Sequence, residues 1–203
     1  MARSRVRGGG DNCGCPRRLT SGAPSGSHAG GSVARRVRWA RVQPAYPPLP
    51  DELVDFTRGG RSLLVGTAST ARVPDCVRAL GLRVWEGASQ LTVIVPAATS
   101  VTSIANLRDN PRIAITCSQI RTHRTIQLKG DVREIRDGSE DDRAFATAYR
   151  AQFAQELAWA GQSSTNTLRL NLWPCFAIDV DIRVAFAQTP GPDAGLRLPQ
   201  ARY

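Results

Sequence analysis

The feature of this sequence that most constrains its fold is the segment CFAIDVDIRVAFAQ, residues 175–188. Neighbouring side chains of a β-strand point to opposite faces of a sheet. Large apolar residues occupy one set of alternate positions: Phe176, Ile178, Val180, Ile182, Val184 and Phe186. The positions between them are small or charged: Ala177, Asp179, Asp181, Arg183 and Ala185. This strict alternation predicts one long strand with one dry face.

Five other segments have the composition and the boundaries of strands. They are residues 61–69, 75–87, 89–96, 111–119 and 123–136. Pro96 ends the third strand, because a proline cannot donate to the hydrogen-bond ladder of a sheet. With the strand at 175–188, these segments predict six strands and therefore a mainly β fold.

Three helices accompany the strands. A short one precedes the first strand, with Asp51 as its N-cap and Gly59–Gly60 as its stop. A second short helix begins at Ser100 and follows the third strand. The long helix begins after Ser139, which stands three residues before Asp142 in a capping-box arrangement. Six strands with flanking helices predict a small closed barrel.

The positive charge of the chain is concentrated at its N-terminal end. The formal net charge is +10, but residues 1–50 contain nine arginines and one acidic residue, Asp11. Residues 51–203 therefore hold 18 of the 27 basic residues and 16 of the 17 acidic ones, and are nearly neutral. Nucleic acid is not an expected partner of a nearly neutral domain.

Residues 1–48 are rich in Gly, Ser, Pro and Arg and have no sustained apolar period. Such a segment cannot offset the entropy lost on ordering, so we expect a disordered basic tail over 1–48 and one domain over 49–203. A targeting leader, a nucleic-acid-binding arm and readthrough from a GC-rich upstream region remain alternatives for the tail. No stretch reaches the roughly 18 apolar residues of a membrane span, and we expect a cytoplasmic protein without membrane contact.

The sequence carries no recognised catalytic or metal-binding motif. The five cysteines, at 13, 15, 76, 117 and 175, do not form the two pairs typical of a structural zinc site, and we interpret them as reduced thiols. No metal is expected. His123 is the only histidine after the tail, and no nucleophile elbow accompanies it, which argues against a Ser-His-Asp hydrolase. The catalytic residues stay unknown.

Basic residues at strand edges and at one helix start indicate an anion site. Arg78 and Arg83 are five residues apart, which places them on opposite faces of a regular strand. A β-bulge at Gly81 would bring both to one side. The second helix offers free backbone N–H groups and hydroxyls over 100–103, a favourable place for a phosphate. The segment RTHRTIQLKG, residues 121–130, adds further donors.

The chain resembles the pyridoxamine 5′-phosphate oxidase-like family of FMN-binding split β-barrels. The resemblance rests on LLVGTAS, PDCVRALGLRVW, LTVIVPAAT, IANLRDNPRIAIT, HRTIQLKGDV and AFAQTPGPDAG, which span roughly residues 50–195. It implies a six-stranded split barrel that forms a homodimer, with FMN between the two subunits.

The resemblance also implies a set of cofactor-binding residues. Arg78 and Arg83 match the two strand positions that grip the flavin phosphate. Thr102 and Ser103 stand where the oxidases have a basic pair, and Thr125 stands where they have a glutamine against the flavin ring. The full implied set is Arg78, Ala79, Leu80, Arg83, Pro96, Thr102, Ser103, Arg124, Thr125 and Lys129.

The C-terminal end, QTPGPDAGLRLPQARY, lacks the Arg-x-His of the true oxidases. The expected function is therefore an FMN-dependent oxidoreductase of unknown small-molecule substrate, and the missing pair argues against pyridoxamine phosphate. Two alternatives remain open: an F420-dependent reductase, and a non-catalytic barrel that binds flavin or haem. A haem would have to use His123 or a ligand other than histidine.

Overall fold

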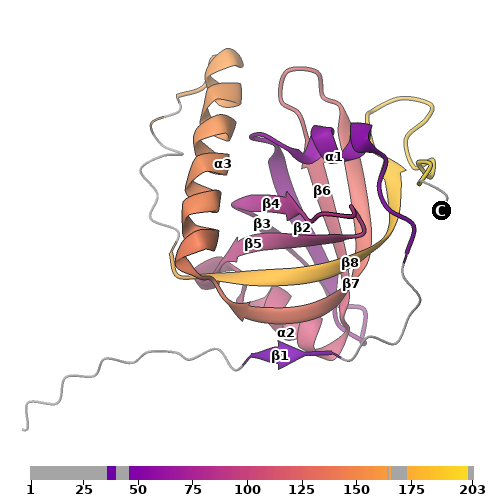
Figure 1. Ribbon diagram of the computed structural model, residues 1–203, viewed down its shortest axis with the longest axis vertical. Helices are drawn as coiled ribbons and strands as arrows, with labels where there is room; N and C mark the ends of the chain where they lie inside the picture. Colours follow the sequence, from indigo (N-terminus) through magenta and orange to yellow (C-terminus); the bar gives the residue numbers. More distant parts are fainter. Residues whose placement is uncertain (1–35, 40–45, 164, 166–172, 201–203) are drawn as a thin grey trace, which may run out of the picture. The chain divides into compact units, whose positions relative to one another are not determined.

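The computed structural model describes residues 36–39, 46–163, 165 and 173–200, which belong to one compact unit, Val33–Tyr203. Figure 1 shows a curled antiparallel sheet with helices packed around it. In chain order the elements are β1 (Val37–Arg38), α1 (Asp51–Thr57), β2 (Ser62–Ala68), β3 (Pro74–Arg78), β4 (Gly81–Val84), β5 (Gln90–Pro96), a 3₁₀ turn (Ala97–Thr99), α2 (Val101–Asp109), β6 (Arg112–Ser118), β7 (Thr125–Asp137), α3 (Glu140–Trp159) and β8 (Cys175–Ala187).

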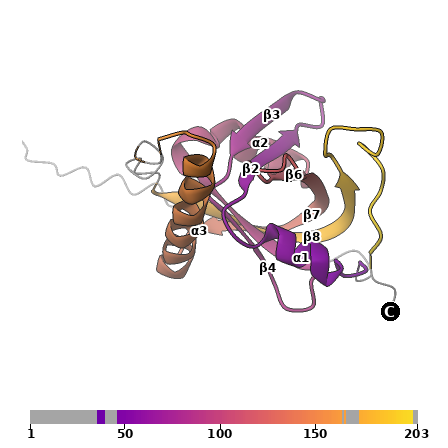
Figure 2. The same ribbon diagram turned by 90° about the horizontal axis from the view of Figure 1, so that it is seen from above.

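The sheet closes into a barrel through the two residues between β3 and β4. The strand order is β3-β2-β6-β7-β8-β5-β4, so β3 and β4 stand at opposite edges of the sheet. The chain nevertheless passes directly from one to the other: the Ala79 N–H donates to Leu63 O on β2, and the Leu80 N–H donates to Ile94 O on β5. Two edges joined by two residues must be neighbours, so the sheet has to curl (Figure 2).

The predicted mainly β barrel is confirmed, with a small difference in strand count. The predicted strand 75–87 is divided into β3 and β4, and β1 is an additional strand. Its two residues pair with Ile135 and Glu134 of β7. They do so because β6 pairs only with residues 125–131 of β7, which leaves the later part of that edge open.

The alternation of β8 is interrupted by a bulge that the sequence pattern did not predict. Ile178, Val180 and Ile182 lie in the core as expected. The register against β7 then shifts, because Val184 pairs with Lys129 but Ile182 pairs with Gly130. Beyond this shift Ala185 is fully buried, whereas Val184 and Phe186 are half-buried. The prediction that Val184 and Phe186 share the dry face is therefore wrong.

The helices begin and end largely where local signals place them. α1 begins at Asp51 itself with Pro50 as the N-cap, so the prediction of Asp51 as the cap is wrong by one residue. It is followed by Gly59 and Gly60, both at positive φ. The capping box of Ser139 and Asp142 at the start of α3 is confirmed.

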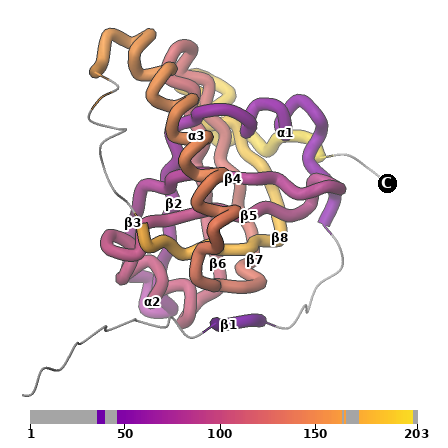
Figure 3. The backbone as a smooth tube through the Cα atoms, turned by 60° about the vertical axis from the view of Figure 1, so that its left-hand side comes forward, coloured from indigo at the N-terminus to yellow at the C-terminus, as the bar shows by residue number. Residues whose placement is uncertain are grey.

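The helices cover different parts of the barrel. α1 and α2 lie near opposite ends of the curled sheet (Figure 1), and α3 lies across β4 (Figure 3). A Cβ on Gly60 would come within 2.5 Å of the Gln152 backbone, so α3 also packs closely on the loop after α1. Among the described residues no helix has the length and apolarity to cross a bilayer.

Parts of the segment 1–48, predicted to be disordered, make defined contacts. β1 pairs with β7, and the Tyr46 hydroxyl donates to Asp131 Oδ2 at 2.8 Å. The Trp39 N–H donates to Arg133 O. Residues 36–39 and 46–48 thus belong to the barrel's surface, and the other residues of the predicted tail lie outside the described ranges.

Candidate functional site

The outer surface of β3, β2, β6, β7 and β8 carries the candidate site, and we call it the open face. Strand register places its outward side chains in rows. One row is Arg78, Leu64, Thr116, Gln127 and Phe186. The next row is Cys76, Gly66, Ala114, Lys129 and Val184. Adjacent rows lie about 7 Å apart along the strands, so side chains of one row can reach the next.

A groove of about 780 Å³ runs over the second row. Small residues, Gly66, Ala68 and Ala114, form part of its lining. Tyr46, Pro47, Pro74 and Phe186 add larger apolar surface, and Asp75, Arg112, Lys129, Arg183 and Arg197 add charge. The groove is therefore a broad surface with cations around it, which suits a flat anionic ligand.

The charges of the groove are only partly neutralised from within the chain. Asp131 lies 2.8 Å from Arg112 and 3.6 Å from Arg183. Lys129, the single lysine of the chain, and Arg197 form no ion pair among the described residues. The Lys129 Nζ instead lies 4.9 Å from the ring centre of Phe186. These two cations remain available to an anionic ligand.

Tyr46 adds a hydrogen-bond donor to the rim of the groove. Burial raises the pKa of Tyr46, and its hydrogen bond to Asp131 raises the pKa further. The phenol therefore stays protonated at neutral pH and donates to the carboxylate. Arg183 lies 5.7 Å from the Tyr46 ring centre, so the tyrosine is held between an acid and a cation.

The chain bends at Leu80 and Gly81, between β3 and β4, which pair with different strands, and this bend sets the direction of both strand arginines. It takes the place of the β-bulge that the sequence predicted at Gly81. Val77, Ala79 and Leu82 lie in the main core, whereas Leu80 joins a second cluster with Ile94. A Cβ on Gly81 would meet Phe145 of α3. Leu80 and Gly81 therefore both point outward, which reverses the alternation. As a result Arg78 and Arg83 both lie on the outside of the barrel.

The two arginines have different surroundings. Arg78 is exposed and donates to Ser62 Oγ at 3.1 Å. Arg83 lies 4.3 Å from the ring centre of Phe145, in a smaller cavity of about 260 Å³ beside α3. Neither forms an ion pair among the described residues. They share no cavity, and only Arg78 borders the open face.

Ala79, Leu80 and Pro96 do not lie on the open face. The N–H groups of Ala79 and Leu80 are used in closing the barrel, and both side chains are buried. Pro96 is buried at the end of β5, where its carbonyl accepts from Ser100 Oγ at 2.6 Å.

The first turn of α2 differs from the helix start that the sequence predicts. Because the Ser100 hydroxyl bonds to Pro96, it does not cap the helix. Ser103 is fully buried and its hydroxyl donates to Asp75 Oδ2 at 2.5 Å, whereas Thr102 is exposed. The Asp75 carboxylate therefore offsets part of the positive potential that this turn would offer a phosphate.

The segment 121–130 is divided between two neighbourhoods. Arg124 lies 2.5 Å from Glu52 and 4.7 Å from the Phe56 ring centre, so it contacts α1. Thr125 lies on the outer side of β7, with its hydroxyl 3.0 Å from Ser118 Oγ. His123 is exposed in the hairpin turn between β6 and β7, at φ 58°. Of this segment, Thr125, Gln127 and Lys129 belong to the open face.

Most residues of the groove were not predicted from the sequence, because Lys129 alone among its described lining residues belongs to the implied cofactor-binding set. The sequence indicated in part that Arg183 faces outward, because it stands among the polar positions of the alternating segment. Gly66 interrupts an apolar strand, which is typical of a close backbone approach. Tyr46, Arg112 and Arg197 gave no local signal, since only the folded chain brings their segments to the groove.

The family of the chain follows from a family model that matches it. The model described as pyridoxamine 5′-phosphate oxidase matches residues 49–172. The chain belongs to this family. The curled barrel is accordingly the split barrel of pyridoxamine 5′-phosphate oxidase-like proteins. No curated protein matches the sequence.

Several solved structures are similar to the chain at low identity. An F420 reductase is 14% identical, with a TM-score of 0.40, over 71% of this chain and 98% of that one. An FMN-binding protein from Syntrophomonas wolfei is 12% identical, with a TM-score of 0.41, over 75% and 90%. HutZ, the heme storage protein from Vibrio cholerae, is 13% identical, with a TM-score of 0.35, over 69% and 94%.

Proposed function

We propose that this protein is a homodimeric, cytoplasmic FMN-dependent oxidoreductase that acts on a small molecule. The observation that carries the proposal is the combination of cations and small residues on the open face. Arg78 in the first row and Lys129 in the second are cations without an acidic partner among the described residues. Gly66 and Ala114 lie beside Lys129 in the second row. A planar cofactor with a phosphate requires both a flat surface and a cation.

The residues of the open face fit a flavin mononucleotide. Arg78 would hold the phosphate, because its guanidinium is exposed and contacts only a serine hydroxyl. Lys129 would add positive charge, and Thr125 and Gln127 would offer polar contacts to the ring. A bound flavin supplies electron transfer, usually of a hydride equivalent. The protein's own part is to bind and orient the two reactants and to exclude water.

Two observations bear on the alternative cofactors. His123, the only described histidine, is exposed in a hairpin turn and lines none of the described cavities, which supports a flavin over a haem. F420 also carries a phosphate, so the same cations would suit it. The visible spectrum of the purified protein separates flavin, deazaflavin and haem, and a deazaflavin or haem spectrum would replace FMN in this proposal.

The second subunit would lie on the open face. Leu64 is 39% exposed, Cys76 is exposed, and Val184 and Phe186 are half-buried. Two copies related by a two-fold axis would bury this patch against itself and enclose a cofactor between them. The described cysteines, Cys76, Cys117 and Cys175, form no disulfide among the described residues, which supports a reducing compartment.

The test is a calorimetric titration of cofactor-free protein with FMN and with riboflavin, which lacks the phosphate. Arg78→Ala should weaken FMN by roughly 1.5–3 kcal/mol, about ten- to a hundredfold, because a charge-assisted hydrogen bond is lost. Riboflavin affinity should change much less. Arg83→Ala should change both affinities little, since its guanidinium stacks on Phe145 in the cavity beside α3 and does not border the open face.

Arg108→Ala is the matched control, because Arg108 is exposed in the last turn of α2 and does not line the groove. It should leave both affinities unchanged. Equal losses for FMN and riboflavin in Arg78→Ala would show that the arginine supports the fold. Unchanged FMN affinity in a folded Arg78→Ala variant would overturn the proposed phosphate site.

A further inference from the structure

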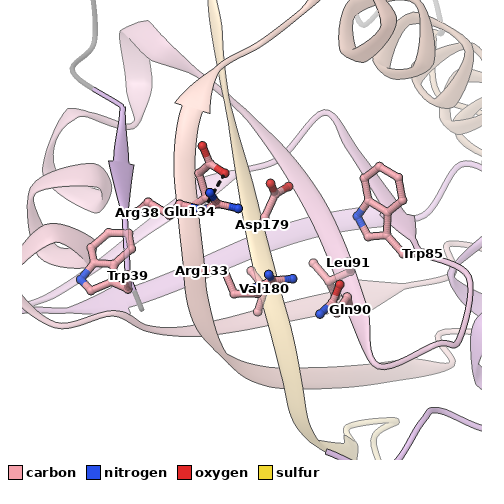
Figure 4. Close-up of a pocket in the computed structure, with 9 residues that line it drawn as sticks. All are labelled: Arg38, Trp39, Trp85, Gln90, Leu91, Arg133, Glu134, Asp179 and Val180. Atoms are coloured by element: carbon pink, nitrogen blue, oxygen red, sulfur yellow. Dashed lines mark ion pairs between the residues drawn. The ribbon is translucent and has the colours of Figure 1, made fainter. Parts of the chain in front are cut away.

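A second cavity, of about 670 Å³, lies on β5, β7 and β8 (Figure 4). None of its lining residues lines the groove of the open face. The volume is within the usual range for small-molecule sites. Its lining residues are Arg38, Trp39, Trp85, Gln90, Leu91, Arg133, Glu134, Asp179 and Val180.

Trp85 presents an exposed ring that is held in a fixed orientation. Trp85 is 44% exposed, which is unusual for so large an apolar residue. Its indole N–H donates to Thr92 Oγ1 at 2.9 Å. The Thr92 hydroxyl, which is buried, donates in turn to Asp179 Oδ1 at 2.6 Å. This relay holds the ring in place before any ligand arrives.

Trp39 stands at the other end of the cavity. Figure 4 shows Trp39 and Trp85 on opposite sides of the side chains of β7 and β8. The backbone N–H of Trp39 donates to Arg133 O, and the adjoining β1 pairs with β7. Trp39 precedes residues 49–172, the part that matches the family model. This wall therefore comes from a segment outside the matched region.

Each charged side chain that lines the cavity lies near a side chain of opposite charge. Glu134 is paired with Arg36 and lies 3.9 Å from Arg38. Arg133 lies 3.7 Å from Asp181. Asp179 lies 3.8 Å from Arg136 and also accepts from Thr92. A cavity with paired charges offers no net attraction to a charged ligand, so its ligand should be uncharged.

Gln90 can form hydrogen bonds with the polar edge of such a ligand. Its amide donates to Asp181 Oδ1 at 2.9 Å, which uses one of the two N–H donors and leaves the carbonyl oxygen. Arg133 likewise has five N–H donors and is only partly engaged by Asp181. A flat ring on Trp85 would bring its donor and acceptor edge toward these two groups.

We propose that this cavity binds an uncharged planar heteroaromatic molecule of nucleoside size. The ring would stack on Trp85, Gln90 would bond to its edge, and Trp39 would close the far side. Aromatic stacking accepts many rings, whereas the amide favours those with adjacent donors and acceptors. The site does not depend on the flavin proposal, because no residue is shared with the open face.

The test is a calorimetric titration of the full chain with adenosine, guanosine, cytidine and uridine. At least one nucleoside should bind saturably, and Trp85→Ala should weaken it roughly 5- to 150-fold, the usual effect of losing one stacking partner. Trp85→Phe keeps an aromatic ring and should retain most of the affinity. Gln90→Ala should weaken binding and should reduce the preference among the four bases.

Two controls separate this site from the rest of the molecule. Trp159→Ala removes a more exposed tryptophan, 73% exposed and stacked on Arg121, which does not line the cavity. It should leave nucleoside affinity unchanged, and so should Arg78→Ala on the open face. The nucleoside 5′-monophosphates should bind no more tightly than the nucleosides.

Three results would overturn the proposal. One is the absence of saturable binding by all four nucleosides to the folded full chain. Another is unchanged affinity in a folded Trp85→Ala variant, or, if that variant does not fold, in Gln90→Ala. The third is a loss of nucleoside binding in Arg78→Ala, which would place the ligand on the open face instead.

Discussion

Gly130 is the residue whose replacement by alanine should disturb the barrel most for the smallest chemical change. It ends the segment RTHRTIQLKG and pairs with Ile182 at the register shift between β7 and β8. Its φ is not in the left-handed region, so its backbone conformation does not require glycine. The constraint is space: an added Cβ would lie closer than 3.0 Å to both Asp181 O and Val180 Cγ1.

The size of the effect follows from these two contacts. Extra atoms in a well-packed core cost about 1–3 kcal/mol, and here one contact is backbone, which cannot rotate away. Replacing glycine in a strand should otherwise stabilise by about 0.5–1 kcal/mol. We therefore expect Gly130→Ala to lower the free energy of unfolding by about 2 kcal/mol. In a chain of this size that corresponds to a Tm lower by about 4–8 °C.

Gly66 provides the matched control, because it lies in β2 and a Cβ there would meet nothing closer than 3.9 Å. Gly66→Ala should leave stability unchanged or raise it by up to about 1 kcal/mol. Urea unfolding followed by far-UV circular dichroism measures both variants. Equal stabilities for Gly130→Ala and Gly66→Ala would refute the argument that the close approach of β7 and β8 at the shift requires a glycine.

Two further predictions follow from the capping box and from the open face. Burial raises the pKa of Asp142, but its bonds to Arg136 and Ser139 outweigh this and the pKa is lowered. Asp142→Asn should therefore lower the free energy of unfolding by about 2 kcal/mol at pH 7. The difference between the two proteins should shrink as the pH falls through the lowered pKa of Asp142. Urea titrations at pH 7 and pH 3 measure it, and an equal difference at both pH values would contradict the prediction. Sedimentation at micromolar concentration should give a dimer with FMN bound, and a monomer that retains FMN would contradict a shared site.

Much of the fold could be predicted from local patterns. The strands and the capping box of α3 were found because each depends on residues close together in sequence. A change of side-chain direction beside Gly81 was predicted because Arg78 and Arg83 have an odd spacing. The bulge at Arg183 was not, because nothing in the alternating segment marks it: the shift exists only in the pairing with Gly130 of β7.

The candidate site, like the fold, could be predicted from the sequence only in part. The sequence alone determined which residues could bind an anion, since charge and hydrogen-bonding capacity belong to each side chain. It could not determine which of them are free. Arg124 is paired with Glu52 of α1, and the Ser103 hydroxyl is bound to Asp75 of β3, whereas Arg78 and Lys129 remain without acidic partners among the described residues.

What the sequence by itself determined is therefore the set of elements and the chemistry that each residue can perform. What only the tertiary structure decided is the register of the strands, the closure of the sheet between β3 and β4, and the contacts that engage or release each charge. The physical reason is that these properties depend on pairs of segments far apart in the chain. Tyr46 and Trp39 show this most clearly, because each lines a cavity formed mainly by strands that lie later in the sequence.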